Sequence, residues 1–226
     1  ENVLSEVVEL FPSELIHIGG DECPKDRWKV CEHCQAKMKS EGLENEEQLQ
    51  GYLVTRIEKF LNSKGRRIIG WDEILEGGVT PSSTVMAWRG AKIGAYAAEH
   101  GHEVVMTPLP ICYFDFYQTQ SQEGEGLAIG GWVSFEKVYG WNPYEGLTAD
   151  ERPYIYGLQC NLWSEYITSF DHLQRMLLPR LAALSEVQWA TERRNPATIR
   201  ARMEQMRRLY ELYGWSYAPY YFEGRE

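Results

Sequence analysis

The sequence predicts an α/β fold built on a parallel sheet, and three observations carry this prediction. Short apolar runs alternate with segments of helical periodicity along the 226 residues. That alternation is typical of right-handed β–α–β units, whose strands lie parallel. Each apolar run also ends in a cluster of acidic or aromatic residues, which indicates functional groups gathered at the carboxyl ends of the strands.

Five segments are predicted to be strands, because each is a short apolar run that turn or helix signals bound. They are residues 15–18, 67–71, 84–88, 103–106 and 156–161. Residues 84–88 and 103–106 flank a helical segment over residues 93–100. This order of elements predicts one sheet whose strands follow one another in sequence order.

The remaining helices are marked by periodicity and by capping residues. Apolar residues at helical spacing predict a helix over residues 2–11, and a further helical run includes residues 184–189. Asn45 with Gln48 resembles a capping box and predicts a helix from there to Gly65. Asn195 and Gly214 are predicted to bound the last helix, which starts at Pro196.

One long segment, residues 108–153, shows little periodicity and is predicted to be a loop. Loops of that length in compact domains are usually functional. No internal repeat, low-complexity stretch or domain boundary interrupts the chain, so residues 1–226 are predicted to form a single unit.

Composition excludes two classes of partner. A net charge of -10 argues against nucleic acid, because phosphate binding depends on clustered Lys and Arg. No apolar run approaches the ~20 residues that span a bilayer, so no membrane span is expected. The chain also contains 8 Trp and 14 Tyr, several beside glycines and carboxylates, which indicates aromatic walls for a ligand.

The five cysteines do not form an even disulfide framework. Cys23, Cys31 and Cys34 are close enough in sequence to form a local disulfide, to remain free thiols or, with His33, to bind zinc. Zinc binding is the least favoured of these three interpretations, because no second pair of ligands follows at the spacing of a tetrahedral site.

Clusters of polar and aromatic residues follow each predicted strand and are expected to meet in one pocket. The clusters are Gly19–Glu22, Gly70–Glu73, Ala87–Gly90, Tyr113–Asp115 and Leu162–Glu165. Carboxylates beside indole and phenol rings suit a sugar, whose hydroxyls need acceptors while its C–H face packs on aromatic rings.

Taken in order, these motifs resemble those of glycoside hydrolase family 20, the β-N-acetylhexosaminidases. The resemblance begins at His17 and extends to Trp189, with Leu178 to Leu181 similar to the start of the family's last barrel helix. It implies a partial (β/α)8 TIM barrel made of strands four to eight with their helices. The first three strands, with an arginine and an Asp/His pair of the family's site, are expected to be missing.

The resemblance also implies the catalytic roles. Glu22 matches the general acid/base, Asp21 matches the carboxylate that orients the substrate's acetamido group, and Tyr113 matches the hydroxyl donor to the acetamido oxygen. In this family that oxygen, and not an enzyme carboxylate, attacks the anomeric carbon. The adjacent charge of Asp21 is expected to help keep Glu22 protonated near neutral pH.

Further residues are implied to bind the sugar. Trp71, Trp88 and Trp163 match the walls around the N-acetyl methyl and the ring, and Trp132 matches a further tryptophan of the site. Asp115 and Glu165 match acceptors for the O4 and O6 hydroxyls.

The implied activity is that of a retaining exo-β-N-acetylhexosaminidase acting on terminal GlcNAc or GalNAc of glycans. No metal or organic cofactor is implied, and a secreted or periplasmic location is expected because such enzymes meet glycans there. Unpaired edges at the first and last strands favour association or aggregation, so the isolated chain is expected to be poorly soluble, to form a homo-oligomer or to depend on the missing half of the barrel. A catalytically silent sugar-binding fragment and a Cys/His zinc module are the alternatives.

Overall fold

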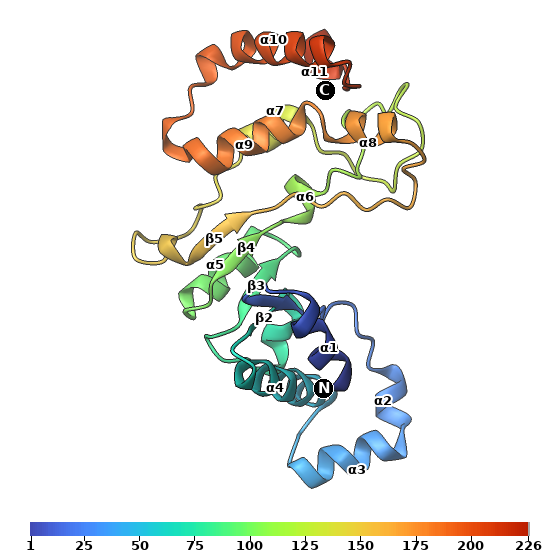
Figure 1. Cartoon of the computed structure of the whole chain (residues 1–226), viewed down its shortest axis with the longest axis vertical. Helices are drawn as coiled ribbons and strands as arrows, with labels where there is room; N and C mark the ends of the chain where they lie inside the picture. Colours follow the sequence, from blue (N-terminus) through green and yellow to red (C-terminus); the bar gives the residue numbers. More distant parts are fainter. Residues whose placement is uncertain (226) are drawn as a thin grey trace. The chain divides into compact units, whose positions relative to one another are not determined.

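The computed structural model describes residues 1–225, which form two compact units (Figure 1). The first unit contains residues 1–105 and 146–156, and the second begins with residues 106–145 and resumes at residue 157. Within residues 1–225, no helix combines the length and the apolar character needed to cross a bilayer.

A five-stranded sheet runs through the chain with its strands in sequence order, as predicted. Its strands are β1 (Leu15–His17), β2 (Arg67–Trp71), β3 (Thr84–Ala87), β4 (Val104–Met106) and β5 (Ile155–Leu158). β1 pairs parallel with β2, Ile16 opposite Ile68, and β2 pairs parallel with β3, Gly70 opposite Val85. The predicted α/β class with a parallel sheet is confirmed.

The last strand lies earlier in the chain than the sequence predicts. Pairing in β5 ends at Leu158, whereas the apolar run was expected to extend to Asn161. Asn161 instead forms a separate parallel bridge with Tyr113, and its N–H donates to the carbonyl of Cys112 at 2.8 Å. The short bridge aligns the two segments that follow β4 and β5.

The first unit contains five α-helices among its described residues, together with the 3₁₀ helix η1 (Asp72–Gly77) and the 3₁₀ turn η2 (Arg152–Tyr154). The α-helices are α1 (Asn2–Leu10), α2 (Asp26–Val30), α3 (Glu32–Glu41), α4 (Glu46–Ser63) and α5 (Ala91–Glu99). The predicted N-cap of α4 is confirmed, since Asn45 Oδ1 accepts from Gln48 N–H at 2.9 Å. Gln48 Oε1 accepts in turn from Glu44 N–H at 2.8 Å, one residue before the partner that a capping box would use. The sequence did not predict α2, α3 or η1.

Helix α4 packs against β2 and η1 (Figure 1). Glu58 of this helix is buried, and its Oε1 accepts from the hydroxyls of Ser83 at 2.7 Å and Ser82 at 2.8 Å, and also from Thr80. These hydrogen bonds lower the pKa of Glu58 although burial acts in the opposite direction. The carboxylate thereby ties α4 to the segment that leads into β3.

The second unit is mainly helical around short paired segments. Its helices are α6 (Leu109–Cys112), α7 (Phe135–Gly140), α8 (Phe170–Leu177), α9 (Arg180–Ala190), α10 (Pro196–Tyr213) and α11 (Tyr220–Glu223). α7 and α9 pack side by side (Figure 1). The long segment predicted as loop therefore contains α6, α7 and the 3₁₀ turn η2 (Arg152–Tyr154), which are too short to give a periodic signal.

The bounds predicted for the helix that starts at Pro196 are confirmed in α10, although the shorter α11 follows it. Asn195 Oδ1 accepts from Ala197 N–H at 3.1 Å, and Gly214 closes α10 in a left-handed conformation with φ 66°. Between α9 and α10 lies the short 3₁₀ turn η3 (Thr191–Arg193).

Gly51→Ala should destabilise the chain, because helix α4 touches η1 where Gly51 faces Gly77. A Cβ added at Gly51 would lie 2.1 Å from the carbonyl oxygen of Gly77. Overpacking of this kind should lower the free energy of unfolding by about 2–3 kcal/mol. That loss should appear although alanine is the better helix former by about 1 kcal/mol.

Urea unfolding of the Gly51→Ala and Gly140→Ala variants measures the effect. Gly140 lies at the end of α7, and a Cβ added there would meet open space, so this residue serves as the matched control. Equal midpoints for the two variants would show that the contact between α4 and η1 is not tight.

Candidate functional site

The segment after β1 presents two adjacent carboxylates. Asp21 and Glu22 are both exposed, and Glu22 has φ 45°, in the left-handed region that non-glycine residues rarely adopt. Gly20, with φ 107°, has no room for a side chain, since a Cβ there would lie 2.6 Å from Cγ2 of Ile74. Strained backbone of this kind is held where the surroundings determine it, often at functional sites.

Hydrogen bonds from α4 and from the following loop hold this segment in place. Gln50 Nε2 donates to the carbonyl of Gly20 at 2.8 Å. Lys25 Nζ donates to the carbonyl of Cys23 at 2.6 Å and to Gln50 Oε1 at 2.5 Å. The backbone on both sides of Asp21 and Glu22 is therefore anchored while the two carboxylates face solvent.

His17 ends β1 and contacts the neighbouring site residues. Its Nδ1 accepts from Gly19 N–H at 3.0 Å, and its ring meets that of Trp71 edge to face at 5.2 Å. Partial burial of the imidazole ring lowers the pKa of His17, and the negative charge of Asp21 acts in the opposite direction. The structure thus brings Asp21 near both His17 and the end of β1.

Trp71 and Trp88, at the ends of β2 and β3, are both half-buried. Trp71 N–H donates to the carbonyl of Gly19 at 2.9 Å, which continues the pairing of β1 and β2 beyond the strands. Trp88 Nε1 donates to Glu73 Oε2 at 2.9 Å, so a carboxylate orients its indole ring. Because these strands are parallel neighbours, Glu22 and the two tryptophans lie at the same edge of the sheet.

Asp72 fixes the end of β3 from the end of β2. Its buried Oδ2 accepts from Trp88 N–H at 2.8 Å and from Arg89 N–H at 3.0 Å. Its Oδ1 pairs with the guanidinium of Arg89, which also pairs with Glu76 at 2.5 Å. Asp72 is therefore a positioning residue, since its contacts set the backbone that carries Trp88.

In the second unit, Asp115 is a buried predicted site residue with a raised pKa. Its side chain is 4% exposed, and neither carboxylate oxygen has a hydrogen-bond partner of good geometry. Burial raises the pKa of Asp115 to about 6, and Glu165 raises it further, against backbone N–H groups and Arg180, which lower it. A buried carboxylate without partners is suited to accept hydrogen bonds from a ligand.

The other predicted residues of this unit lie on the segments around Asp115. Tyr113 is buried and belongs to the bridge with Asn161, whereas Trp163 and Glu165 follow that bridge and are exposed. The negative charge of Glu165 is one of the influences that raise the pKa of Asp115.

Trp132 lies apart from this bridge, on a segment that pairs with Tyr117. The two residues form a parallel bridge, in which Val133 N–H donates to the carbonyl of Tyr117 at 2.7 Å. The ammonium of Lys137 lies 4.9 Å from the centre of the Trp132 indole ring. The structure therefore groups the predicted residues within each unit, and the prediction that all of them line one pocket stays a prediction.

Arg180 supports the Asp115 segment from α9 and was not predicted to have this role. Its guanidinium is fully buried and donates to the carbonyls of Phe114 at 2.6 Å, Val133 at 3.0 Å and Phe116 at 3.1 Å. Burial lowers the pKa of Arg180 to about 9. A single side chain thus holds the segments that carry both Asp115 and Trp132.

Comparison with known proteins identifies the family of the chain. The profile described as "Glycosyl hydrolase family 20, catalytic domain" matches residues 1–192. The chain belongs to this family. A β-hexosaminidase of Porphyromonas gingivalis is 48% identical over 190 residues, and one of Vibrio furnissii is 36% identical over 186 residues.

Solved structures of the family share the fold. An exo-β-N-acetylglucosaminidase of Vibrio harveyi, crystallised in complex with N-acetylglucosamine, superposes with a TM-score of 0.87 at 31% identity. The match covers 95% of this chain and 34% of that one. The Porphyromonas and Vibrio furnissii matches cover 83% and 81% of this chain but only 24% and 30% of those relatives. The partial-barrel assignment is consistent with this coverage.

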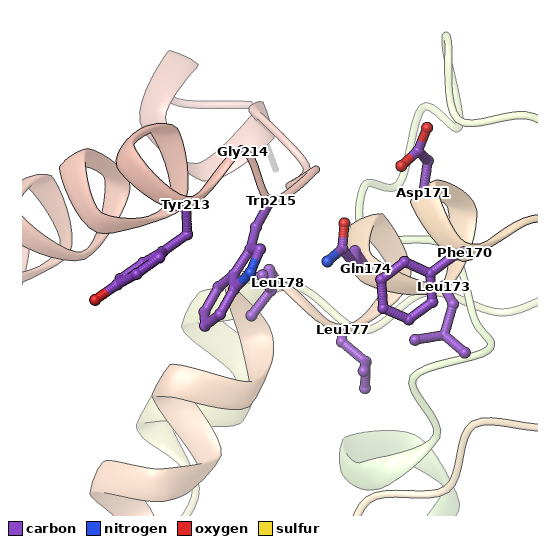
Figure 2. Close-up of a pocket in the computed structure, with 9 residues that line it drawn as sticks. All are labelled: Phe170, Asp171, Leu173, Gln174, Leu177, Leu178, Tyr213, Gly214 and Trp215. Carbon is purple, nitrogen blue, oxygen red and sulfur yellow. The ribbon is translucent and has the colours of Figure 1, made fainter.

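A separate hollow in the second unit contains none of the predicted site residues (Figure 2). It is open, has a volume of about 490 Å³ and lies between α8 and the turn after α10. Phe170, Leu173 and Trp215 point into it, and Gln174 Oε1 accepts from Ser216 N–H at 3.0 Å at its edge. Among residues 1–225, no group of three or more metal-ligating side chains occurs.

Asp115→Asn should change how stability depends on pH. A carboxyl whose pKa is raised from about 3.9 unfolded to about 6 folded loses folding free energy as pH rises between those values. The asparagine variant carries no such titration. Its unfolding free energy relative to the native chain should therefore rise between about pH 4 and pH 6, by up to about 3 kcal/mol, and level off above.

Urea unfolding at a series of pH values measures this difference. Asp150→Asn, at an exposed aspartate, controls for the loss of a carboxylate. A difference between native chain and Asp115→Asn variant that is constant over this range would contradict the burial of an unpartnered carboxyl at Asp115.

Proposed function

We propose that the protein carrying this chain is a retaining exo-β-N-acetylhexosaminidase that removes terminal GlcNAc or GalNAc from glycans with the help of the substrate's own acetamido group. The observation that carries the proposal is the adjacent pair Asp21 and Glu22, exposed at the end of β1 on a backbone with φ 45° at Glu22. Membership of glycosyl hydrolase family 20 supports the reaction class.

Glu22 acts as the general acid and then as the general base. In the first step its carboxylic acid gives a proton to the glycosidic oxygen as the bond from that oxygen to the anomeric carbon breaks. In the second step the carboxylate takes a proton from water, which attacks the same carbon. The two steps together return Glu22 to its starting protonation state.

The nucleophile of the first step is the carbonyl oxygen of the 2-acetamido group. It bonds to the anomeric carbon on the face opposite the leaving group, and water then opens the resulting ring from the first face. Two displacements give net retention of configuration. Asp21 accepts from the acetamido N–H, and Tyr113 donates to the acetamido oxygen, so that this group is held in the attacking geometry.

The remaining residues bind the sugar. Trp71 and Trp88 are half-buried indoles fixed by backbone and carboxylate contacts, as suits walls for an N-acetyl methyl and a sugar ring. Trp163 and Trp132 are assigned the same kind of contact. Asp115 is assigned the role of accepting from a sugar hydroxyl, because its two buried oxygens have no protein hydrogen-bond partner of good geometry. Glu165 is assigned the role of accepting from a second hydroxyl of the sugar.

The names of relatives point to the same substrate class. The Porphyromonas gingivalis relative is a β-hexosaminidase, and the Vibrio harveyi structure holds N-acetylglucosamine. Since this chain covers less than two fifths of each, the activity is assigned to the whole polypeptide that carries it. Location outside the cytoplasm, where terminal N-acetylhexosamines of glycans are met, is part of this proposal.

The full-length protein should hydrolyse an aryl 2-acetamido glycoside but barely act on the matching 2-hydroxy glycoside. The second sugar lacks the attacking oxygen, so the loss should appear in kcat more than in KM. Steady-state kinetics on the two substrates measures it. Comparable kcat values, or a glycosyl adduct on an enzyme carboxylate seen by mass spectrometry, would point to a two-carboxylate mechanism. Binding of N-acetylglucosamine without turnover would support the silent sugar-binding alternative.

Glu22→Gln and Asp21→Asn should differ in their dependence on the leaving group. Without its acid, Glu22→Gln should lose about 10²–10⁴-fold in kcat on alkyl glycosides and far less on activated aryl glycosides, which need little protonation. Asp21→Asn should slow both, because the acetamide is misaligned in the first step whatever the leaving group. Asp26→Asn, at an exposed aspartate of α2, is the matched control. If kcat depended on the leaving group in the same way in both variants, the separate roles assigned to Glu22 and Asp21 would be wrong.

A further inference from the structure

A pair of cysteines lies at the start of α3, outside the proposed catalytic site. Cys31 is at once the residue that ends α2 and the N-cap of α3, with extended backbone angles (φ −84°, ψ 114°). Cys34 lies in the first turn of α3, and both side chains are half-exposed. The spacing Cys31-Glu32-His33-Cys34 is the one found in dithiol redox motifs at helix starts.

The position of Cys31 favours its thiolate. The backbone N–H of Cys34 lowers the pKa of Cys31 most, followed by the Cys34 thiol and the backbone N–H of His33, while burial and the charge of Glu32 act against them. The hydrogen bond to Cys31 raises the pKa of the Cys34 thiol. The two sulfurs therefore differ in kind: Cys31 is suited to attack, and Cys34 to follow as the resolving thiol.

A bond between the two sulfurs requires the Cβ atoms of Cys31 and Cys34 to approach each other. Residues three apart on a helix have Cβ atoms ~5–6 Å apart. A disulfide requires ~3.5–4.5 Å. Cys31 can close this gap because it lies at the junction between two helices, outside the regular turns of α3. Its carbonyl already accepts from Gln35 N–H at 3.0 Å, so the helix start remains intact.

The other cysteines differ from this pair. Cys112 is fully buried and burial raises its pKa well above the ordinary value, and burial likewise raises the pKa of Cys160. Cys23 lies on the far side of α2 in sequence, and its carbonyl accepts from Lys25 Nζ at 2.6 Å. Within the described residues, neither Cys23 nor His33 completes a group of three metal ligands with the pair.

We propose that Cys31 and Cys34 form a redox-active dithiol that low-molecular-weight disulfides, such as glutathione disulfide, convert reversibly into an intramolecular disulfide. The Cys31 thiolate attacks one sulfur of the reagent, whose S–S bond breaks, and one glutathione thiolate leaves. Cys34 then gives up its proton and attacks the Cys31 sulfur, and the second glutathione leaves. Together the two cysteines lose two protons and two electrons, which the glutathione disulfide gains.

Incubation of the whole chain with glutathione disulfide tests the proposal. The tryptic peptide of residues 30–37 contains both cysteines and no internal Lys or Arg. After oxidation, its mass should be lower by two hydrogen atoms, and excess dithiothreitol should restore it. Cys34→Ser should stop at a mixed disulfide, seen as one glutathione on residue 31. Cys31→Ser should form a mixed disulfide with glutathione on residue 34 about tenfold more slowly, since the more acidic thiol is lost.

Cys23→Ser is the control and should behave as the native chain does. Three outcomes would overturn the proposal: a disulfide from Cys23 to either partner, equal adduct formation in the two single variants, or one tightly bound zinc per chain that blocks oxidation until a chelator removes it. Thermal unfolding of each variant verifies that a serine at these half-exposed positions leaves the fold intact.

Discussion

The parallel pairing of β1 with β2 and of β2 with β3 is the constraint on which the first unit depends. Strands of three to five residues contribute little on their own, so their hydrogen bonds and the apolar residues between them must position everything that follows. The register delivers the residues after each strand to one edge. Gly20 and Gly70 both lie against Ile74, so a larger residue at either position would push the carboxylate-bearing turn away from the sheet.

Buried polar side chains fix the segments next to the strands, which the few hydrogen bonds of the short strands do not hold in place. Asp72 binds two backbone N–H groups at the end of β3, Glu58 binds the hydroxyls before that strand, and Arg180 binds carbonyls in the second unit. Each is an ion in a nearly dry position, where a missing partner would be strongly unfavourable. These residues therefore position the site without having to touch a sugar, and they connect segments distant in sequence.

Asp115 differs from these three because neither of its oxygens has a protein hydrogen-bond partner of good geometry. Its raised pKa reflects the same burial that Arg180 tolerates with the help of several carbonyls. A folded chain retains an unsatisfied carboxyl where a ligand supplies the missing donors, which agrees with the sugar-binding role assigned to it. In the first unit, the strained backbone of Glu22 is the comparable feature.

The sequence by itself predicted the strands and the capped helices, and it supplied the candidate residues on which the proposed function depends. The helix caps at Asn45 and Asn195 were predictable because a capping side chain bonds to a backbone N–H only two or three residues away. Strand β2 was predictable because its apolar residues follow one another in the sequence. The helices α2, α3 and α7 were missed because each is short or, like α3, weakly amphipathic, and leaves no periodic signal. Tertiary structure alone decided the burial of Asp115, the backbone of Glu22 and the role of Arg180. The physical reason is that solvation and hydrogen bonding of these groups depend on residues tens of positions away, which no local pattern records.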